Sequence, residues 1–547
     1  MADQEFDAIV TAKYKSATAA AAAAATGPRI PLTYNDLDAD DVLQLVNLIV
    51  SGRQLTMGER VLQFEREFAA YVGAEYAVYS NSGSSANLLF VAAMCNKLGV
   101  YRLQPGDEVL VPAVCWSTSV WPLIQYDLKP VFVDVDPRTL NVDVEQLRKK
   151  VTPRTRAIMM VHVMSNSADM DAVQQLARER GLVVVEGTCE SLGSRFGGKM
   201  LGTIGNFGSF SFYYSHHMTT IEGGMTVCHT REDYELLKCL RSHGWTCHGD
   251  AEFQQAAVQK YPGVDPRYMF INLGYNVRPM DIQAVLGSSQ LRKLAGRNAN
   301  RIANYSRITA LLLADPRNEG GRLVFPAERT PGADCAWFGV CFLVHESVDQ
   351  QKFLAHLTAL GIENRPIVTG NFLRQPYFIE NNVDVGSPAD FPGADAVHFR
   401  GGYIGLSCHP LPDEDVAFIA SSLIDTALKF MGKLVSELFF VPACVLHFVC
   451  YVGAFSFQLA PRLIMPLFFP KCTGCRSRAK RILLATGLES HPRSRWGTPP
   501  CSAMSPRCAA SAGLGSQHCI NTSGPTHWPC ILQRMRSAWR VYRTYAR

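Results

Sequence analysis

Acidic residues are almost missing from the end of the sequence. Across the last 110 residues Glu489 is the only acid, beside fourteen lysines and arginines. The first 437 residues hold 39 lysines and arginines against 47 acids, so the two parts carry formal charges of +13 and −8. The basic excess is confined to the tail, which argues against nucleic-acid binding by the chain as a whole, and we expect no nucleic-acid partner.

A secretory signal is also lacking, because the first residues include several acids and no apolar core segment follows them. We interpret residues 1–29 as a flexible leader that contains the low-complexity run Ala19–Ala25. Of the 17 cysteines, the nine in residues 1–437 are scattered and are not spaced like a disulfide framework. Free thiols of this kind indicate a reducing compartment, so we expect a cytoplasmic protein.

Residues 431–547 form a tail of different character. Its segment Leu438–Ala460 carries no formal charge and is long enough to span a bilayer, although proline, histidine and glutamine interrupt it. Three interpretations stay open: a C-terminal membrane anchor, a disordered or partner-binding tail, and an extension outside the native protein. Cys472 and Cys475 form one C-x-x-C pair without a second pair at zinc-site spacing, so we predict no metal site.

Between residues 30 and about 430, short apolar runs alternate with amphipathic stretches. This alternation predicts an α/β fold with a mainly parallel sheet, in which ligands bind at the carboxyl ends of the strands. A long helix over residues 279–313 is expected to connect a large domain (30–300) to a smaller C-terminal α/β domain (301–430). The expected strands are Glu108–Val111, Pro130–Val135, Ala157–Val163, Leu182–Val185 and Trp337–Val344, and the expected helices include Val144–Lys150, Met170–Arg180 and Asp349–Leu360.

The segment Ser80–Asn87 reads Ser-Asn-Ser-Gly-Ser-Ser-Ala-Asn and precedes the apolar run Leu88–Met94. A Gly/Ser loop that opens a helix can bind an anion, because free backbone N–H groups, the helix dipole and serine hydroxyls meet there. Taken alone, the motif is also compatible with a plain N-capped helix.

Aromatic and titratable residues follow other predicted strands. Trp116 comes just after one of them and either stacks on a planar cofactor or packs in the core. His216 and His217 stand among aromatic and hydroxyl residues shortly before Glu222-Gly-Gly. One of the two histidines can be a general base, or a hydrogen-bonded structural residue. Since neighbouring side chains usually diverge, we do not expect both histidines to serve one site.

Together these motifs resemble the DegT/DnrJ/StrS sugar aminotransferase family, whose members have the fold of fold-type-I pyridoxal-phosphate (PLP) enzymes. The resemblance extends from about Ile30 to Leu428 and implies a large PLP-binding domain followed by a smaller α/β domain. Further matching stretches are Thr56–Gly58, Gly106–Ala113, Pro130–Asp134, Gly198–Thr203, Leu240–Trp245 and Gly274–Pro279.

Aminotransferases of this family have a lysine at the position of His216, and that lysine binds the cofactor covalently. Histidine lacks the primary amine for this bond, and the replacement resembles the sugar 3-dehydratase branch, most closely GDP-4-keto-6-deoxymannose 3-dehydratase. A related branch holds an iron–sulfur cluster partly through a Cys-x-Cys pair, which does not occur here. Stretches that support the dehydratase branch are Val111–Thr118, Cys189–Gly193, Tyr214–Met218 and Asn364–Leu373.

The dehydratase resemblance implies a PLP- and pyridoxamine-phosphate-dependent lyase of deoxysugar or polysaccharide biosynthesis. Glutamate would be its amino donor and a nucleotide sugar its substrate. The implied catalytic base is His216, and the implied cofactor-binding residues are Ser84, Ser85 and Ser211 at the phosphate, Trp116 on the ring and Glu190 at the ring hydroxyl. Asn276 would reach the phosphate of a neighbouring subunit, which implies a homodimer, and His243 and Arg365 are implied on the substrate side.

One residue departs from the family pattern. Gly187 stands where the family has an aspartate that pairs with the protonated pyridine nitrogen. Glu186 is not expected to replace it, because alternation along a strand directs its side chain to the opposite face. The departure leaves open a weakened or altered dehydratase, a pseudoenzyme that binds without turnover, and an error in the sequence. A sugar-nucleotide aminotransferase of the same family is the alternative enzyme activity.

Overall fold

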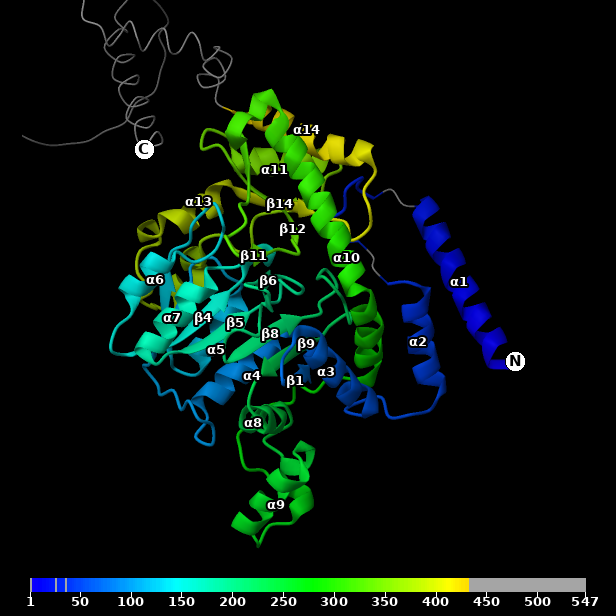
Figure 1. Cartoon of the computed structure of the whole chain (residues 1–547), viewed down its shortest axis with the longest axis vertical. Helices are drawn as coiled ribbons and strands as arrows, with labels where there is room; N and C mark the ends of the chain where they lie inside the picture. The colour runs from blue at the N-terminus through cyan, green and yellow to red at the C-terminus, as the bar shows by residue number, and fades with distance from the viewer. Residues whose placement is uncertain (1, 25–26, 35–36, 432–547) are drawn as a thin grey trace, which may run out of the picture. The chain divides into compact units, whose positions relative to one another are not determined.

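The computed structural model describes residues 2–24, 27–34 and 37–431 of the chain (Figure 1). The apolar segment 438–460 and the C-x-x-C pair therefore lie outside the described residues. Among the helices that are described, none combines the length and the apolar character needed to cross a membrane.

The central sheet has seven strands in the order β1-β9-β8-β5-β4-β2-β3. β9 is antiparallel to both of its neighbours, and the other six strands run in one direction, so their carboxyl ends lie along one edge. This confirms the α/β fold and places four predicted strands within two residues of their expected bounds. The strands are β1 Tyr76–Ser80, β2 Glu108–Pro112, β3 Lys129–Val133, β4 Thr155–Val161, β5 Val183–Gly187, β8 Phe207–Ser211 and β9 Gly224–Cys228.

Helices cover both faces of this sheet (Figure 1). On one face Phe68 packs edge-on against Phe210, and on the other Phe90 stacks on Phe207, with ring centroids 5.0 and 6.3 Å apart. Such a sheet buries apolar side chains on both faces, which explains its continuous apolar strands. The helices of this part are α2 Ala39–Val50, α3 Glu59–Val72, α4 Gly83–Cys95, α5 Trp121–Gln125, α6 Val144–Lys150, α7 Met170–Arg180, α8 Arg231–Arg241 and α9 Ala251–Lys260.

A second, antiparallel sheet has the order β10-β12-β14-β13, and β11, β6 and β7 form a third, three-stranded one. The 34-residue helix α10, Asp281–Ala314, runs between the large sheet and the second one, as the sequence predicts. The strands are β6 Arg195–Phe196, β7 Lys199–Met200, β10 Val324–Pro326, β11 Ala333–Asp334, β12 Gly339–Val344, β13 Asn364–Arg365 and β14 Gly401–Gly405, and the helices are α11 Gln350–Ala359, α12 Pro376–Glu380, α13 Pro392–Arg400 and α14 Asp413–Phe430.

The predicted domain boundary at residue 300 falls inside α10, which continues without a break. The start of the predicted large domain also lies on the smaller one. Ile30 N donates to Gly361 O over 2.9 Å, and Glu363 N donates to Ile30 O over 2.9 Å. The two predicted domains are thus connected by the continuous helix α10 and by the backbone hydrogen bonds of Ile30 with Gly361 and Glu363.

The predicted flexible leader differs from the structure, in which Ala2–Ala24 form one helix, α1. Alanine has the highest helix propensity of all residues, so an alanine-rich run favours a helix even where it is low in complexity. The Tyr14 hydroxyl donates to Leu37 O over 2.8 Å, which ties this helix to the segment before α2.

Candidate active site

The predicted phosphate-binding serines lie at the carboxyl ends of β1 and β8. Ser82 caps α4, since its side chain accepts a hydrogen bond from Ser85 N over 3.1 Å. Gly83, the first residue of α4, lies so close to β8 that a Cβ there would be 2.5 Å from Ser211 Cβ. The close approach brings Ser211 to the amino end of α4, beside exposed Ser84 and half-buried Ser85. Hydroxyls and free N–H groups meet there in an anion-binding arrangement.

Trp116 follows β2 and leaves 56% of its surface exposed, although the five residues before it are buried. Contacts on both sides fix the turn that carries it. The Thr369 hydroxyl donates to Cys115 O over 2.8 Å, and Asn87 Nδ2 donates to Thr118 O over 3.1 Å. The indole is therefore held at the edge with its surface free to stack on a planar group.

Glu190 follows β5, and its carboxylate accepts a hydrogen bond from Met164 N over 3.1 Å. Burial raises the pKa of the Glu190 carboxyl to about 7, and the Met164 hydrogen bond acts in the opposite direction. Its backbone O accepts a 2.5 Å hydrogen bond from the Ser165 hydroxyl. The turn after β4 therefore holds both the main chain and the side chain of Glu190.

His216 lies in the turn after β8, with its ring 5.4 Å from the ring of Phe338. Burial and the positive charge of Arg301 lower the pKa of His216 to about 4, so its imidazole is neutral at pH 7. Its buried Nδ1 has no hydrogen-bond partner among the described residues. A neutral imidazole with a free ring nitrogen can accept a proton.

The expectation that the two adjacent histidines diverge is not met. The His217 ring lies 5.7 Å from the same Phe338 ring that His216 contacts. The two residues lie in an irregular turn, where successive side chains do not alternate as they do along a strand. Phe338, which comes directly before β12, thus contacts both imidazoles.

Glu186 faces away from Gly187, as alternation along β5 predicts. Its buried carboxylate lies 3.0 Å from His162 Nε2 and accepts hydrogen bonds from the backbone N–H groups of Gly202, Ile204 and Gly205. Burial acts to raise the pKa of Glu186, but the His162 contact and the hydrogen bonds from Gly205 and Gly202 outweigh it and hold the pKa below its ordinary value. Glu186 therefore anchors the loop before β8 and cannot replace an acid at position 187.

The remaining predicted residues are spread more widely. Arg365 is exposed on β13, in register with Tyr403, whose ring lies 6.1 Å from that of Phe338. His243 is exposed and has a left-handed backbone, with φ 65°. Asn276 is exposed, and its Oδ1 accepts a 3.0 Å hydrogen bond from Arg278. The structure places Arg365 beside the residues around Phe338. His243 N donates to Tyr275 O over 2.6 Å, and Asn81 N donates to Val277 O over 3.1 Å, so His243 and Asn276 lie on two paired segments next to the serine-rich segment Ser80–Asn87.

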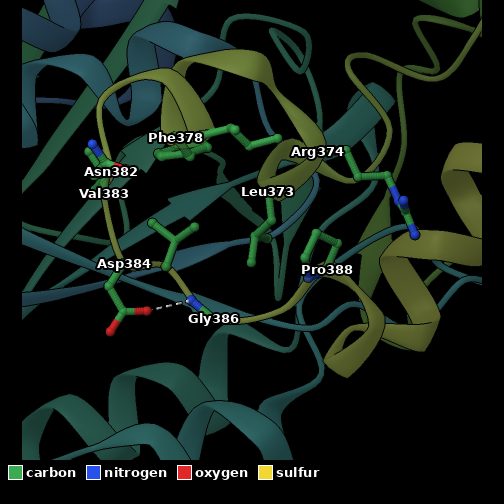
Figure 2. Close-up of a pocket in the computed structure, with 10 residues that line it drawn as sticks. Leu373, Arg374, Phe378, Asn382, Val383, Asp384, Gly386 and Pro388 are labelled. Carbon is green, nitrogen blue, oxygen red and sulfur yellow. Dashed lines mark hydrogen bonds between the residues drawn. The ribbon is translucent and has the colours of Figure 1, made fainter.

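A hollow of about 570 Å³ is lined by residues from Leu373 to Pro388 (Figure 2). Leu373, Phe378 and Pro388 supply apolar walls, and Asp384 accepts a hydrogen bond from Gly386 N over 3.2 Å. None of the predicted site residues lines this hollow.

Residues that sequence reasoning missed come from other segments. Met164 and Ser165 hold Glu190, and Arg301 on α10 donates to Phe338 O over 3.3 Å. None belongs to a local motif. The one sequence feature that could have pointed to any of them is the polar run Ser165–Ser167, which comes just after a predicted strand.

The residues at this edge fit a phosphorylated pyridine cofactor at its phosphate, ring face and ring hydroxyl. The fit rests on the close contact between Gly83 and Ser211, the exposed indole of Trp116 and the half-buried carboxylate of Glu190. The place of an acid for the ring nitrogen does not fit, because Gly187 has no side chain.

Comparisons with known proteins agree with this geometry. Residues 36–423 match the DegT/DnrJ/EryC1/StrS aminotransferase family. The GDP-4-keto-6-deoxy-D-mannose 3-dehydratase of Escherichia coli O55:H7 is 37% identical over 366 residues, which are 65% of this chain and 91% of the relative. A crystal structure of a GDP-4-keto-6-deoxymannose-3-dehydratase mutant with bound GDP-perosamine is 33% identical, with a TM-score of 0.66, over 72% of this chain and all of that one. Another structure of that enzyme, with a trapped PLP-glutamate geminal diamine, is 32% identical, with a TM-score of 0.64, over the same shares. The chain therefore belongs to the DegT/DnrJ/EryC1/StrS aminotransferase family, the PLP-dependent sugar-nucleotide dehydratases and aminotransferases of deoxysugar biosynthesis.

Proposed function

We propose that the chain is a sugar-nucleotide 3-dehydratase that uses PLP and its pyridoxamine form. The observation that carries this proposal is His216, a neutral imidazole at the end of β8 with a free ring nitrogen. A side chain without a primary amine cannot bind the cofactor covalently, but it can move a proton. The likeness to two dehydratase structures at 32–33% identity supports the same assignment.

In this proposal the cofactor phosphate binds at the amino end of α4, through the hydroxyls of Ser84, Ser85 and Ser211. Trp116 stacks on the ring, and Glu190 contacts the ring hydroxyl. When bound, the cofactor supplies an amino group that condenses with the sugar ketone and a ring that takes up electrons.

His216 takes a proton from the methylene carbon of the cofactor, and the C3 hydroxyl of the sugar leaves. The imidazole is neutral at pH 7 because of burial and Arg301, so no proton must leave it first. Trp116 and Glu190 would hold the ring, and His216 would be the residue that moves the proton. The products of this activity would be a 4-keto-3,6-dideoxy sugar nucleotide and ammonia.

The proposed partners are a nucleotide sugar, glutamate as amino donor and a second copy of this chain. Binding of the sugar and of glutamate is supported by the GDP-perosamine and PLP-glutamate of the two dehydratase structures. A homodimer is supported by exposed apolar residues near Asn276, among them Leu273, which is 95% exposed, and Phe270. A cytoplasmic location is supported by the nine cysteines of the described residues, all of which are free.

Gly187 favours a second candidate, a pseudoenzyme that binds the cofactor without turnover. Without an acid at the ring nitrogen the ring takes up electrons less readily, and a charge-assisted hydrogen bond of roughly 1.5–3 kcal/mol is missing. The two candidates share the binding residues and differ only in turnover.

The test is to incubate the full chain with PLP, glutamate and GDP-4-keto-6-deoxymannose and to follow the nucleotide sugars by mass spectrometry. The proposal predicts a 3-deoxy product that the matched variant His216→Asn does not form. An amino sugar would overturn it in favour of an aminotransferase, and a bound cofactor without any product would favour the pseudoenzyme.

A further inference from the structure

The turn after β4 has an unusual backbone. Met164 and Ser165 have φ angles of 54° and 76°, although neither is a glycine, and both side chains are buried. Two successive left-handed residues of this kind are rare, because the Cβ atom approaches the following carbonyl oxygen. Such a turn persists only where surrounding contacts determine it.

The contacts of the turn lead to Glu190. Met164 N donates to the Glu190 carboxylate over 3.1 Å, and the Ser165 hydroxyl donates to Glu190 O over 2.5 Å. The left-handed conformation directs both the Met164 N–H and the Ser165 hydroxyl toward Glu190. If the turn relaxed to an ordinary conformation, the carboxylate would lose the backbone donor that orients it.

His217 contacts this turn from the segment after β8. Its Nε2 lies 3.2 Å from the Ser165 hydroxyl oxygen, and both side chains are fully buried. Because the hydroxyl gives its one proton to Glu190 O, the contact is a hydrogen bond in the Nε2–H tautomer of His217, in which Nε2 donates to the hydroxyl oxygen. The groups that face His217 include Arg301 and His216, which with burial keep its pKa well below the ordinary value and its imidazole neutral.

We propose that His217 is a positioning residue for Glu190. By donating to the Ser165 hydroxyl it holds the Met164–Ser165 turn in its left-handed form, and this turn fixes the Glu190 carboxylate. The role of Glu190 at the cofactor ring hydroxyl rests on the proposed function, but the contact between His217 and the turn does not.

Hydrogen exchange of the cofactor-free full chain, measured by mass spectrometry, tests the contact. Two variants isolate the donor: His217→Leu removes it, and His217→Gln keeps an N–H donor at a similar reach. Ser165→Ala removes the acceptor by a smaller change, which keeps the test open if His217→Leu does not fold. The matched control is Thr246→Ala, because the equally buried Thr246 hydroxyl donates to Met269 O over 3.3 Å, away from the Met164–Ser165 turn and from Glu190.

We expect peptides that cover residues 163–166 to exchange at least tenfold faster in His217→Leu and in Ser165→Ala, and at the wild-type rate in His217→Gln and Thr246→Ala. Unchanged exchange in the folded His217→Leu or Ser165→Ala variant would overturn the inference. Equal acceleration in Thr246→Ala would overturn it as well, because the effect would then be general loosening.

A PLP titration of the same variants separates this inference from the proposed function. The dissociation constant of PLP should rise at least threefold in His217→Leu and return to the wild-type value in His217→Gln. A wild-type chain that binds no PLP would contradict the proposed function, while the exchange result would still decide the role of His217.

Discussion

The methyl group of Met159 lies beside the place where a side chain at Gly187 would begin. An ideal Cβ on Gly187 would be 3.3 Å from Met159 Cε and 3.4 Å from the backbone oxygen of Met160. β4 and β5 are parallel neighbours here, with Met159 in register with Val185. The site thus presents an apolar methyl group beside the position where the family has an aspartate.

We predict that Gly187→Asp speeds the dehydratase reaction at least tenfold, because the acid would keep the pyridine nitrogen cationic. A charge-assisted hydrogen bond of about 1.5–3 kcal/mol corresponds to a factor of ten or more in rate. The kcat with the keto sugar and glutamate measures the gain. Gly187→Asn is the matched control of equal size, and a gain in it too, or none in Gly187→Asp, would contradict the role of charge. Shortening Met159 in Gly187→Asp/Met159→Ala should relieve the close contact.

Burial and, after it, Arg301 should set the acid limb of the pH profile. Its charge contributes to lowering the pKa of His216 to about 4, so the base stays neutral and active down to that range. In Arg301→Gln the pKa should move upward toward its ordinary value near 6.5, and the acid limb of kcat/KM should move to higher pH with it. Arg292→Gln, an exposed arginine on the same helix, is the control. An acid limb that does not move in Arg301→Gln would show that this charge does not act on the base.

Gly83→Ala should weaken PLP binding at least tenfold. The added Cβ would lie 2.5 Å from Ser211 Cβ and 3.1 Å from Ser211 Cα, so α4 and β8 must move apart. This movement would separate Ser84 and Ser85 on α4 from Ser211 on β8. Gly296→Ala in the middle of α10 is a matched control, because its Cβ would meet nothing within 4 Å. The control should leave binding unchanged and stabilise the helix by about 0.5–1 kcal/mol. A spectroscopic PLP titration and a denaturant titration measure the two effects, and equal PLP affinity in both variants would contradict the account of this site.

Arg241→Met should cost about 3–5 kcal/mol of folding free energy, since it leaves Glu65 buried without its cation. Arg241 is fully buried and donates to Glu65 Oε1 over 2.5 Å and to Tyr79 O over 2.7 Å. Tyr79 lies on β1, directly before the serine-rich segment Ser80–Asn87, so PLP binding should weaken as well. Arg267→Ala, which breaks an exposed pair with Asp265, should leave stability nearly unchanged. A small loss in Arg241→Met, measured by urea unfolding, would argue against the buried pair as a support of this loop.

Residues at strand ends were predictable because their signals are local. Ser84, Trp116, Glu190 and His216 each follow an apolar run, and parallel strands bring such positions to one edge. Their roles at the cofactor remain predictions. The helix over Ala2–Ala24 was missed because low complexity was taken to mean flexibility, whereas alanine favours helix.

The contacts that orient the site were not predictable, because they join segments far apart in the sequence. Phe338 meets two histidines more than a hundred residues before it, and the left-handed turn at Met164 depends on contacts with Glu190 and His217. Neither hydrophobic periodicity nor the spacing of motifs predicts such contacts. The pairing of Ile30 with Gly361 and Glu363 is another contact between distant segments, and the domain boundaries stay a prediction.

The central claim is that His216 directs the reaction to loss of the C3 hydroxyl and away from transfer of an amino group. The ratio of ammonia released to nucleotide sugar converted tests it most directly. With the full chain, PLP, glutamate and GDP-4-keto-6-deoxymannose, we predict one ammonia for each 3-deoxy sugar formed, and neither in His216→Asn. Conversion to an amino sugar without release of ammonia, or a 3-deoxy product formed equally well by His216→Asn, would contradict the account.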